Sequence, residues 1–121
     1  GKNKKYPGSD VLDEVAWNVR NSDWHTHTVG KKKPNELGLY DMFGNISEYC
    51  LDSHIDRHCK FEQPVNPICL KKNGKYIVTR GGNYSLSDSL EFERRGVSND
   101  YGCDLCGLRL CLSSYRYKNE D

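Results

Sequence analysis

The chain has 121 residues, of which 36% are hydrophobic and 29% charged, and its formal net charge is +1. This length suits a single domain with a modest core, and the composition excludes an intrinsically disordered chain. A net charge so close to zero gives no attraction toward nucleic acid, and no apolar stretch approaches the roughly 18 residues that a membrane-spanning helix needs. We therefore expect one soluble globular domain, residues 1–121, that neither binds nucleic acid nor spans a membrane.

Four short segments carry secondary-structure signals, and a long stretch between them carries none. The apolar positions of Asp10 to Asn18 are compatible with one short helix or an irregular segment. Ser47 to Leu51 predicts a short strand, and the β-branched run from Tyr76 to Thr79, which ends before two glycines, predicts the clearest strand of the chain. Leu108 to Leu112 alternates leucine with other residues, which predicts a half-buried strand. Residues 52–74 show no clear periodicity and are expected to form a loop.

The segment from Asn35 to Tyr49 concentrates turn residues and oxygen-bearing side chains. Gly44 and Asn45 predict a bend that needs positive φ. Asp41 and Glu48 lie on either side of this bend, and a tight bend turns backbone carbonyls in the same direction as nearby carboxylates. Such an oxygen-rich arrangement is the one that Ca²⁺ prefers. The alternative is that the two carboxylates only cap the turn through hydrogen bonds.

The state of the six cysteines stays open at the level of sequence. An even number of cysteines in a small chain permits a disulfide framework. Cys103 and Cys106 form a C-x-x-C pair, which could bind zinc if a second ligand pair lay nearby. The candidates for that second pair are His54, His58 and Cys59. The simplest interpretation is that the cysteines are structural thiols.

Three blocks occur along the chain in a fixed order. Gly38 to Tyr49 follows the pattern Gly-Leu-Tyr-(Asp/Asn)-x-x-Gly-Asn-x-x-Glu-(Trp/Tyr), Tyr6 to Trp17 lies upstream of it, and Arg80 to Tyr84 with Gly107 to Leu110 lies downstream. Together they resemble the formylglycine-generating enzyme (sulfatase-modifying factor) family. The resemblance implies an α+β fold of the C-type-lectin-like kind, irregular, with short antiparallel strands and long loops. It also implies that the chain corresponds to the C-terminal half of a family domain and lacks the N-terminal half.

The same resemblance argues against the family's oxidase chemistry. The enzymes bind copper through two cysteines after the Gly-Gly-Ser-Tyr turn, and those two positions hold Leu86 and Glu91 here. Cu(I) selects soft thiolate ligands, which neither side chain provides. We therefore expect no copper. A copper-dependent oxidoreductase that uses Cys103 and Cys106 as displaced ligands is the disfavoured alternative.

The resemblance implies a calcium site in the central block. Its ligands would be the Asp41 side chain, the carbonyl groups of Gly44 and Ile46, and the Glu48 side chain. Arg109, in the closing block, is expected to be a structural charge that bonds to loop carbonyls rather than to a ligand.

The segment between Tyr84 and Gly107 is predicted to form an exposed recognition face, with Tyr84 packed beneath it. Its composition overlaps with that of adaptable recognition loops, although any long surface loop is rich in the same residues. The ligand would be a protein or a carbohydrate, and the location extracellular or on the surface of a cell or virion. The predicted contact residues are Ser85, Ser87, Asp88, Phe92, Asn99, Asp100, Tyr101 and Asp104.

A sharper hypothesis concerns variable proteins of diversity-generating retroelements, which use this family's fold and vary between its last two blocks. Mutagenesis directed at adenines of Asn codons cannot produce Glu, Lys, Gln, Met or Trp. Neither Asn83 to Leu90 nor Gly96 to Cys106 contains any of these five residue types. The preferred prediction is thus a non-catalytic binding module, and the main alternative is a structural or accessory module of a larger protein.

Overall fold

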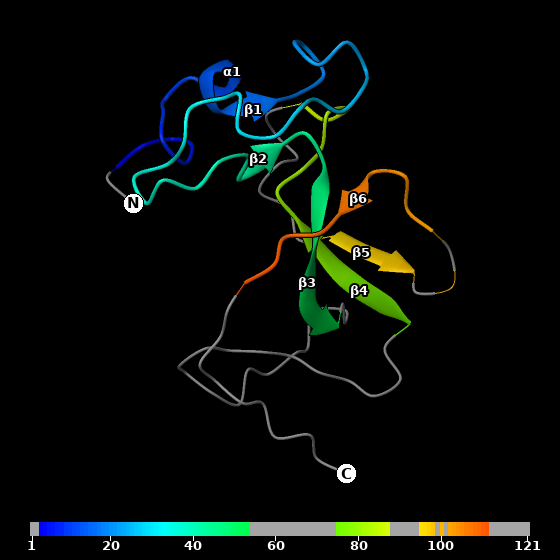
Figure 1. Ribbon diagram of the computed structural model, residues 1–121. Coiled ribbons are helices and arrows are strands. Elements are labelled where there is room, and N and C mark those ends of the chain that lie inside the picture. The colour runs from blue at the N-terminus through cyan, green and yellow to red at the C-terminus, as the bar shows by residue number, and fades with distance from the viewer. Residues whose placement is uncertain (1–2, 54–74, 88–94, 99, 101, 112–121) are drawn as a thin grey trace.

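The computed structural model describes residues 3–53, 75–87, 95–98, 100 and 102–111 (Figure 1). The chain order of its elements is α1 (Leu12–Val15), β1 (Ala16–Trp17), β2 (Phe43–Gly44), β3 (Ser47–Ser53), β4 (Tyr76–Arg80), β5 (Arg95–Ser98) and β6 (Cys106–Gly107). β1 and β2 pair in parallel, and the other four strands form a sheet in the order β5-β4-β3-β6. One short helix with short strands and long loops confirms the predicted α+β class. Within the described residues, no helix is long and apolar enough to cross a membrane.

The N-terminal part of the chain forms a small core beside the sheet (Figure 1). The predicted helix is present as α1, which ends where Ala16 adopts an extended conformation, with φ −137° and ψ 144°. Leu12 and Val15, three positions apart, both lie on the buried face of this single turn. The core is completed by apolar side chains from the preceding turn and from the two paired strands: Tyr6, Ala16 and Phe43.

The four-stranded sheet contains both strands that the sequence indicated most clearly. β3 and β4 confirm the strands predicted from Ser47 to Leu51 and from Tyr76 to Thr79, each with a somewhat later end. The loop predicted for residues 52–74 is therefore wrong at Asp52 and Ser53, which belong to β3, and residues 54–74 lie outside the described residues. They pair antiparallel, β5 pairs antiparallel with the other edge of β4, and β6 pairs in parallel with β3. Val78, at the centre of β4, is only 1% exposed. The sheet therefore forms around the most β-branched segment of the chain.

The strand predicted from Leu108 to Leu112 is wrong over residues 108–111, and Leu112 lies outside the described residues. The strand in this region is β6, which ends at Gly107, and residues 108–111 have no regular secondary structure. Leu108 is 73% exposed and Leu110 is 86% exposed. Both leucines face solvent, because the side chain between them makes the contacts to the central block. That side chain is Arg109.

The bend in the central block has the predicted backbone conformation. Gly44 has φ 69° and Asn45 has φ 62°. A Cβ atom on Gly44 would overlap the carbonyl oxygen of Trp17, so this position is restricted by space as well as by φ. The amide of Asn45 donates to the same oxygen at 2.7 Å. The close contact between β1 and β2 therefore requires glycine.

We expect Gly44→Ala to lower the free energy of unfolding by about 2–5 kcal/mol, since it adds backbone strain to a steric overlap. Gly38→Ala is the matched control: Gly38 also has positive φ, at 76°, but a Cβ there would have no heavy atom within 4 Å. Gly38→Ala should lower the free energy of unfolding by only about 1–2 kcal/mol. Urea denaturation measures both, and equal losses would contradict the steric argument.

Candidate functional site

The turn after β4 is attached to the central bend through backbone hydrogen bonds. Gly81 and Gly82 both have positive φ, at 91° and 67°. The amide of Gly44 donates to the carbonyl of Gly81 at 2.7 Å, and the amide of Tyr84 donates to the carbonyl of Asn45 at 3.0 Å. The loop that begins at the glycine pair is therefore fixed to β2 and the bend.

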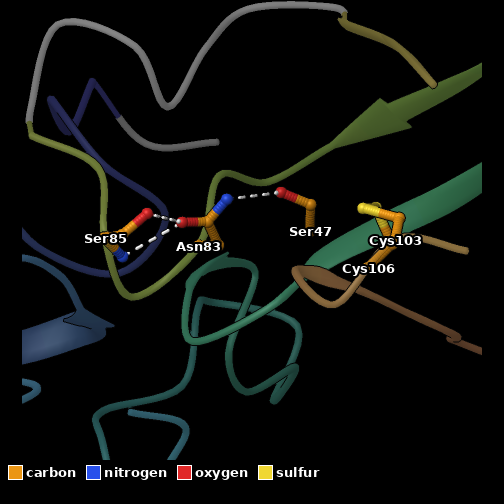
Figure 2. Close-up of a disulfide and its surroundings, with 5 residues drawn as sticks. All are labelled: Ser47, Asn83, Ser85, Cys103 and Cys106. Atoms are coloured by element: carbon orange, nitrogen blue, oxygen red, sulfur yellow. Dashed lines mark hydrogen bonds between the residues drawn. A yellow bond between two sulfur atoms is a disulfide. The ribbon is translucent and has the colours of Figure 1, made fainter. Parts of the chain in front are cut away.

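The side chain of Asn83 organises the next residues of this loop (Figure 2). Asn83 is 5% exposed, and its Oδ1 accepts hydrogen bonds from the amide of Ser85 at 3.0 Å and from Ser85 Oγ at 2.7 Å. Its Nδ2 donates to Ser47 Oγ at 3.3 Å. An asparagine that bonds a backbone amide two residues later closes a turn of its own. Asn83 thus connects the loop after β4 with the first residue of β3.

The other side of the loop is held by the segment that follows β1. Ser22, which is fully buried, donates from Oγ to the carbonyl of Tyr84 at 2.9 Å. The amide of Val19 donates to the carbonyl of Leu86 at 3.2 Å. Residues 83–86 are therefore attached to two different parts of the fold before the exposed residue Ser87 is reached.

A disulfide joins Cys103 and Cys106, whose Cα atoms are 5.3 Å apart. The disulfide alternative is confirmed for this pair, and the interpretation of these two cysteines as thiols or as a zinc pair is wrong. The loop that they close pairs with β3, where the amide of Ser47 donates to the carbonyl of Leu105 at 2.9 Å. The proposed zinc partners lie outside the described residues: His54, His58 and Cys59.

Arg109 connects the end of the described chain with the central block. Its Nε donates to Glu48 Oε2 at 2.7 Å and its Nη2 to Glu48 Oε1 at 2.6 Å. The same Nη2 donates to the carbonyl oxygens of Tyr40 and Asp41, at 2.9 and 3.0 Å. The hydrogen bonds to Glu48 raise the pKa of Arg109 against the opposing effect of burial. The prediction that Arg109 bonds to loop carbonyls is confirmed.

Comparison with known proteins identifies the family. A model of the sulfatase-modifying factor enzyme 1-like domain matches residues 1–113. The chain belongs to this family. The solved structure of Treponema denticola variable protein 1 superposes with a TM-score of 0.75 and 35% identity, over 89% of this chain and 40% of that one. PvdO from Pseudomonas aeruginosa superposes with a TM-score of 0.70 and 23% identity, over 89% of this chain and 41% of that one. These similarities confirm the C-type-lectin-like fold of the sulfatase-modifying factor family.

A relative is also found by sequence. The chain is 33% identical over 118 residues to the protein named chaperone protein LppX of Paenibacillus barcinonensis. The match covers 84% of this chain and 40% of LppX. The family domain described here thus spans about two fifths of the length of LppX and of the two structures above.

The calcium site that the family resemblance implied can be compared with the side chains present. Asp41 is 9% exposed, its Oδ2 accepts from the amide of Gly30 at 2.7 Å, and its Oδ1 is buried without a hydrogen-bond partner. An unpartnered buried carboxylate oxygen fits a cation. Glu48, in contrast, already has both oxygens bonded to Arg109. Among the residues that can be described, no group of three or more His, Cys, Asp or Glu side chains could hold a metal ion. The site of Asp41, Gly44, Ile46 and Glu48 stays a prediction.

Half of the predicted ligand contacts lie in the described part of the chain. Ser87, Asp100 and Asp104 are exposed, whereas Ser85 is half-buried and bonded to Asn83. Asp104 lies between the two disulfide-bonded cysteines, so the disulfide loop presents it. Ser85 therefore supports the loop rather than presenting a free hydroxyl. The other four predicted contacts lie outside the described residues: Asp88, Phe92, Asn99 and Tyr101.

An aromatic stack supports the site and was not predicted. The rings of Trp17 and His27 stack with centroids 3.8 Å apart, and Lys32 Nζ lies 4.0 Å from the centroid of the Trp17 ring. His27 Nε2 is 2.8 Å from the carbonyl oxygen of Ser22, the residue whose hydroxyl holds Tyr84. Trp17 is 10 positions from His27 and 15 from Lys32, so no periodic pattern in the sequence could indicate these contacts.

Proposed function

We propose that this chain is a non-catalytic ligand-binding module whose contacts come from the segment between Ser85 and Cys106. The observation that carries the proposal is the contrast between buried supports and exposed side chains at this face. Asn83 is buried and bonded on both sides, whereas Ser87 and Asp104, on the two loops that meet at Ser47, are exposed. Binding residues are typically found on loops that a rigid scaffold positions.

The proposed mechanism is recognition by a surface that is ordered before the ligand arrives. A loop that is already held by several hydrogen bonds loses little conformational freedom on binding, so less of the interaction energy is spent on ordering. The contacts of Ser22 and Asn45 to Tyr84 supply this order on one side. The pairing of Ser47 with the disulfide loop supplies it on the other.

The specific form of the proposal is a variable protein diversified by a retroelement, with a protein or carbohydrate as the ligand. Two observations support it: the absence of five residue types from Asn83 to Leu90 and from Gly96 to Cys106, and the similarity to a Treponema denticola protein that carries the name variable protein. The Cys103–Cys106 disulfide supports a location outside the cytoplasm, at the surface of a cell or virion or beyond it.

Two alternatives remain from the sequence. The oxidoreductase alternative needs Cys103 and Cys106 as thiolates, and in the disulfide neither sulfur can bind Cu(I) as a thiolate. The accessory-module alternative is favoured by Leu108 and Leu110, which are exposed apolar side chains on the same segment. It predicts that the chain has no ligand of its own.

We further propose Ca²⁺ as a stabiliser of the central bend, held by Asp41 and Glu48 with the carbonyl groups of Gly44 and Ile46. The unpartnered Oδ1 of Asp41 supports this, and the engagement of Glu48 by Arg109 opposes it. When bound, the ion would supply only positive charge to the carboxylates of the bend. Asp41 would then be neutralised without changing its bond to Gly30.

Binding can be tested with the chain as a fluorescent probe on a glycan array and against a library of displayed peptides. We expect a ligand in one of these two classes, and the variant Ser87→Ala with Asp104→Ala should bind it at least tenfold more weakly, since both side chains are exposed on the proposed face. Lys4→Ala is the control, because Lys4 is an exposed residue of the N-terminal segment paired with Asp10. Binding to nothing above background, or equal losses for the face variant and the control, would contradict the proposal and favour an accessory module.

Calcium can be tested by thermal unfolding in Ca²⁺ and in a chelator. At a concentration of 100 times Kd, the ion should contribute about 2.7 kcal/mol to the free energy of unfolding. Asp41→Asn should remove this increment, since the amide keeps the shape of the carboxylate but not its charge. Asp41→Asn is a better test than Glu48→Ala, because Glu48→Ala would also remove the partner of Arg109. Identical melting temperatures of the unmutated chain with and without chelator would exclude the site.

A further inference from the structure

The recognition proposed above uses the loop that the Cys103–Cys106 disulfide closes, but it assigns no chemistry to the disulfide itself. Its cysteines are separated by three positions, and both residues are half-buried. The two cysteines begin and end a loop that leads directly into β6. This position connects the bridge to the sheet, because Cys106 is the first residue of β6.

The bridge is poorly suited to stabilise the fold as a whole. A disulfide acts mainly by limiting the unfolded chain, and this effect is small when the closed loop contains only four residues. The turn is closed a second time by the hydrogen bond from the amide of Cys106 to the carbonyl of Cys103, at 3.1 Å. The contribution of the bridge is therefore local to this turn and to the residues bonded to it.

A chain of contacts connects the disulfide with the loop after β4 (Figure 2). Cys106 pairs with Ser47 in the register of β6 and β3, and the amide of Ser47 donates to the carbonyl of Leu105. Ser47 Oγ accepts from Asn83, and Asn83 accepts from the amide and the hydroxyl of Ser85. Figure 2 shows Ser47 between Asn83 and the two sulfur atoms. A shift of the disulfide turn would therefore move Ser47, which is a hydrogen-bond partner of Asn83.

We propose that Cys103 and Cys106 form a reversible thiol–disulfide exchange site for dithiol reductants, and that its redox state sets the order of the loop after Asn83. In the oxidised state, the disulfide turn holds Ser47 in register with β6. In the reduced state the covalent link is lost, and Ser47 is held by the two-residue pairing of β6, the backbone turn and its hydrogen bond to Asn83. The ion pair between Arg109 and Glu48 then holds β6 to β3 without the disulfide. The proposal goes beyond the proposed function, because its test needs no ligand.

The exchange reaction is balanced by the dithiol. One thiolate of the reductant attacks the sulfur of one cysteine, forms a mixed disulfide and releases the other cysteine as a thiolate. The second thiol of the reductant then displaces the first cysteine. The reductant leaves as a disulfide, and Cys103 and Cys106 have gained two electrons and two protons. Reoxidation needs another disulfide, on a protein or a small molecule, which takes up the two electrons by the same exchange steps in reverse.

The first measurement is alkylation after treatment with dithiothreitol, read by mass spectrometry of the peptide that contains both cysteines. We expect both Cys103 and Cys106 to become alkylated at reductant concentrations that leave the protein folded by circular dichroism. A pair that is alkylated only when the fold is lost would overturn the proposal, because it would show a structural bridge without exchange in the native state.

The second measurement is amide hydrogen exchange of the full chain and of Cys103→Ser with Cys106→Ser. This variant changes the pair alone, whereas a reductant is added to all six cysteines of the chain. The amides of Ser47 and Ser85 should exchange at least tenfold faster in the variant, because they bond to Leu105 and Asn83. The amides of Gly44 and Asn45, bonded to Gly81 and Trp17, should not change.

The exposed Cys111 supplies the matched control, and Cys111→Ser should leave all of these rates unchanged. An unchanged rate at Ser47 or at Ser85 in the double variant would overturn the transmission from the disulfide to the loop. A rate that rises equally at Gly44 and Asn45 would also overturn it, since the bridge would then stabilise the whole fold. If the serine pair does not fold, Cys103→Ala with Cys106→Ala and dithiothreitol-treated protein provide the same comparison.

Discussion

The ion pair between Arg109 and Glu48 is the contact on which the described arrangement depends. One guanidinium donates to both oxygens of a carboxylate 61 positions earlier in the chain and to two carbonyl groups of the segment before the bend. A planar fork is suited to this geometry in a way that a lysine ammonium is not. The contact fixes the chain just after β6 to the start of β3, and a parallel pairing of only two residues is thereby held in place.

The fold separates the residues that support the proposed recognition face from those that are exposed on it. Asn83 and Ser47 are buried and join the two loops, and Ser22 holds one loop from the N-terminal part of the chain. Ser87 and Asp104 are exposed on the loops thus joined. A substitution at an exposed position would change the chemistry of the face without removing any of these supports. This separation is the physical basis of the proposal that the exposed face can vary while the scaffold stays constant.

Sequence patterns predicted the elements whose signal is local. β4 is a β-branched run, the bend at Gly44 needs positive φ, and the resemblance placed Arg109 on loop carbonyls. The half-buried strand from Leu108 to Leu112 was predicted wrongly, because alternation alone cannot show that an ion pair directs Arg109 inward and leaves Leu108 and Leu110 exposed. β5 was missed, since Arg95–Ser98 has a glycine and no alternating pattern. The role of Asn83 was missed because the hydrogen bond from its side-chain amide to Ser47 joins the loop after β4 to β3, which only the fold brings together. For the same reason, the engagement of Glu48 by Arg109, which bears on the calcium site, could not be predicted.

The measurement that tests the division into support and face most directly is deep sequencing of the coding region for residues 47–109 across a population of the source. The account predicts that Glu48, Asn83 and Arg109 are constant, as is the glycine pair after β4. It predicts that Ser87, Asp100 and Asp104 vary among residue types other than Glu, Lys, Gln, Met and Trp. Variation at the supporting residues that equals variation at the exposed ones, or a uniform sequence throughout, would contradict a diversified recognition face.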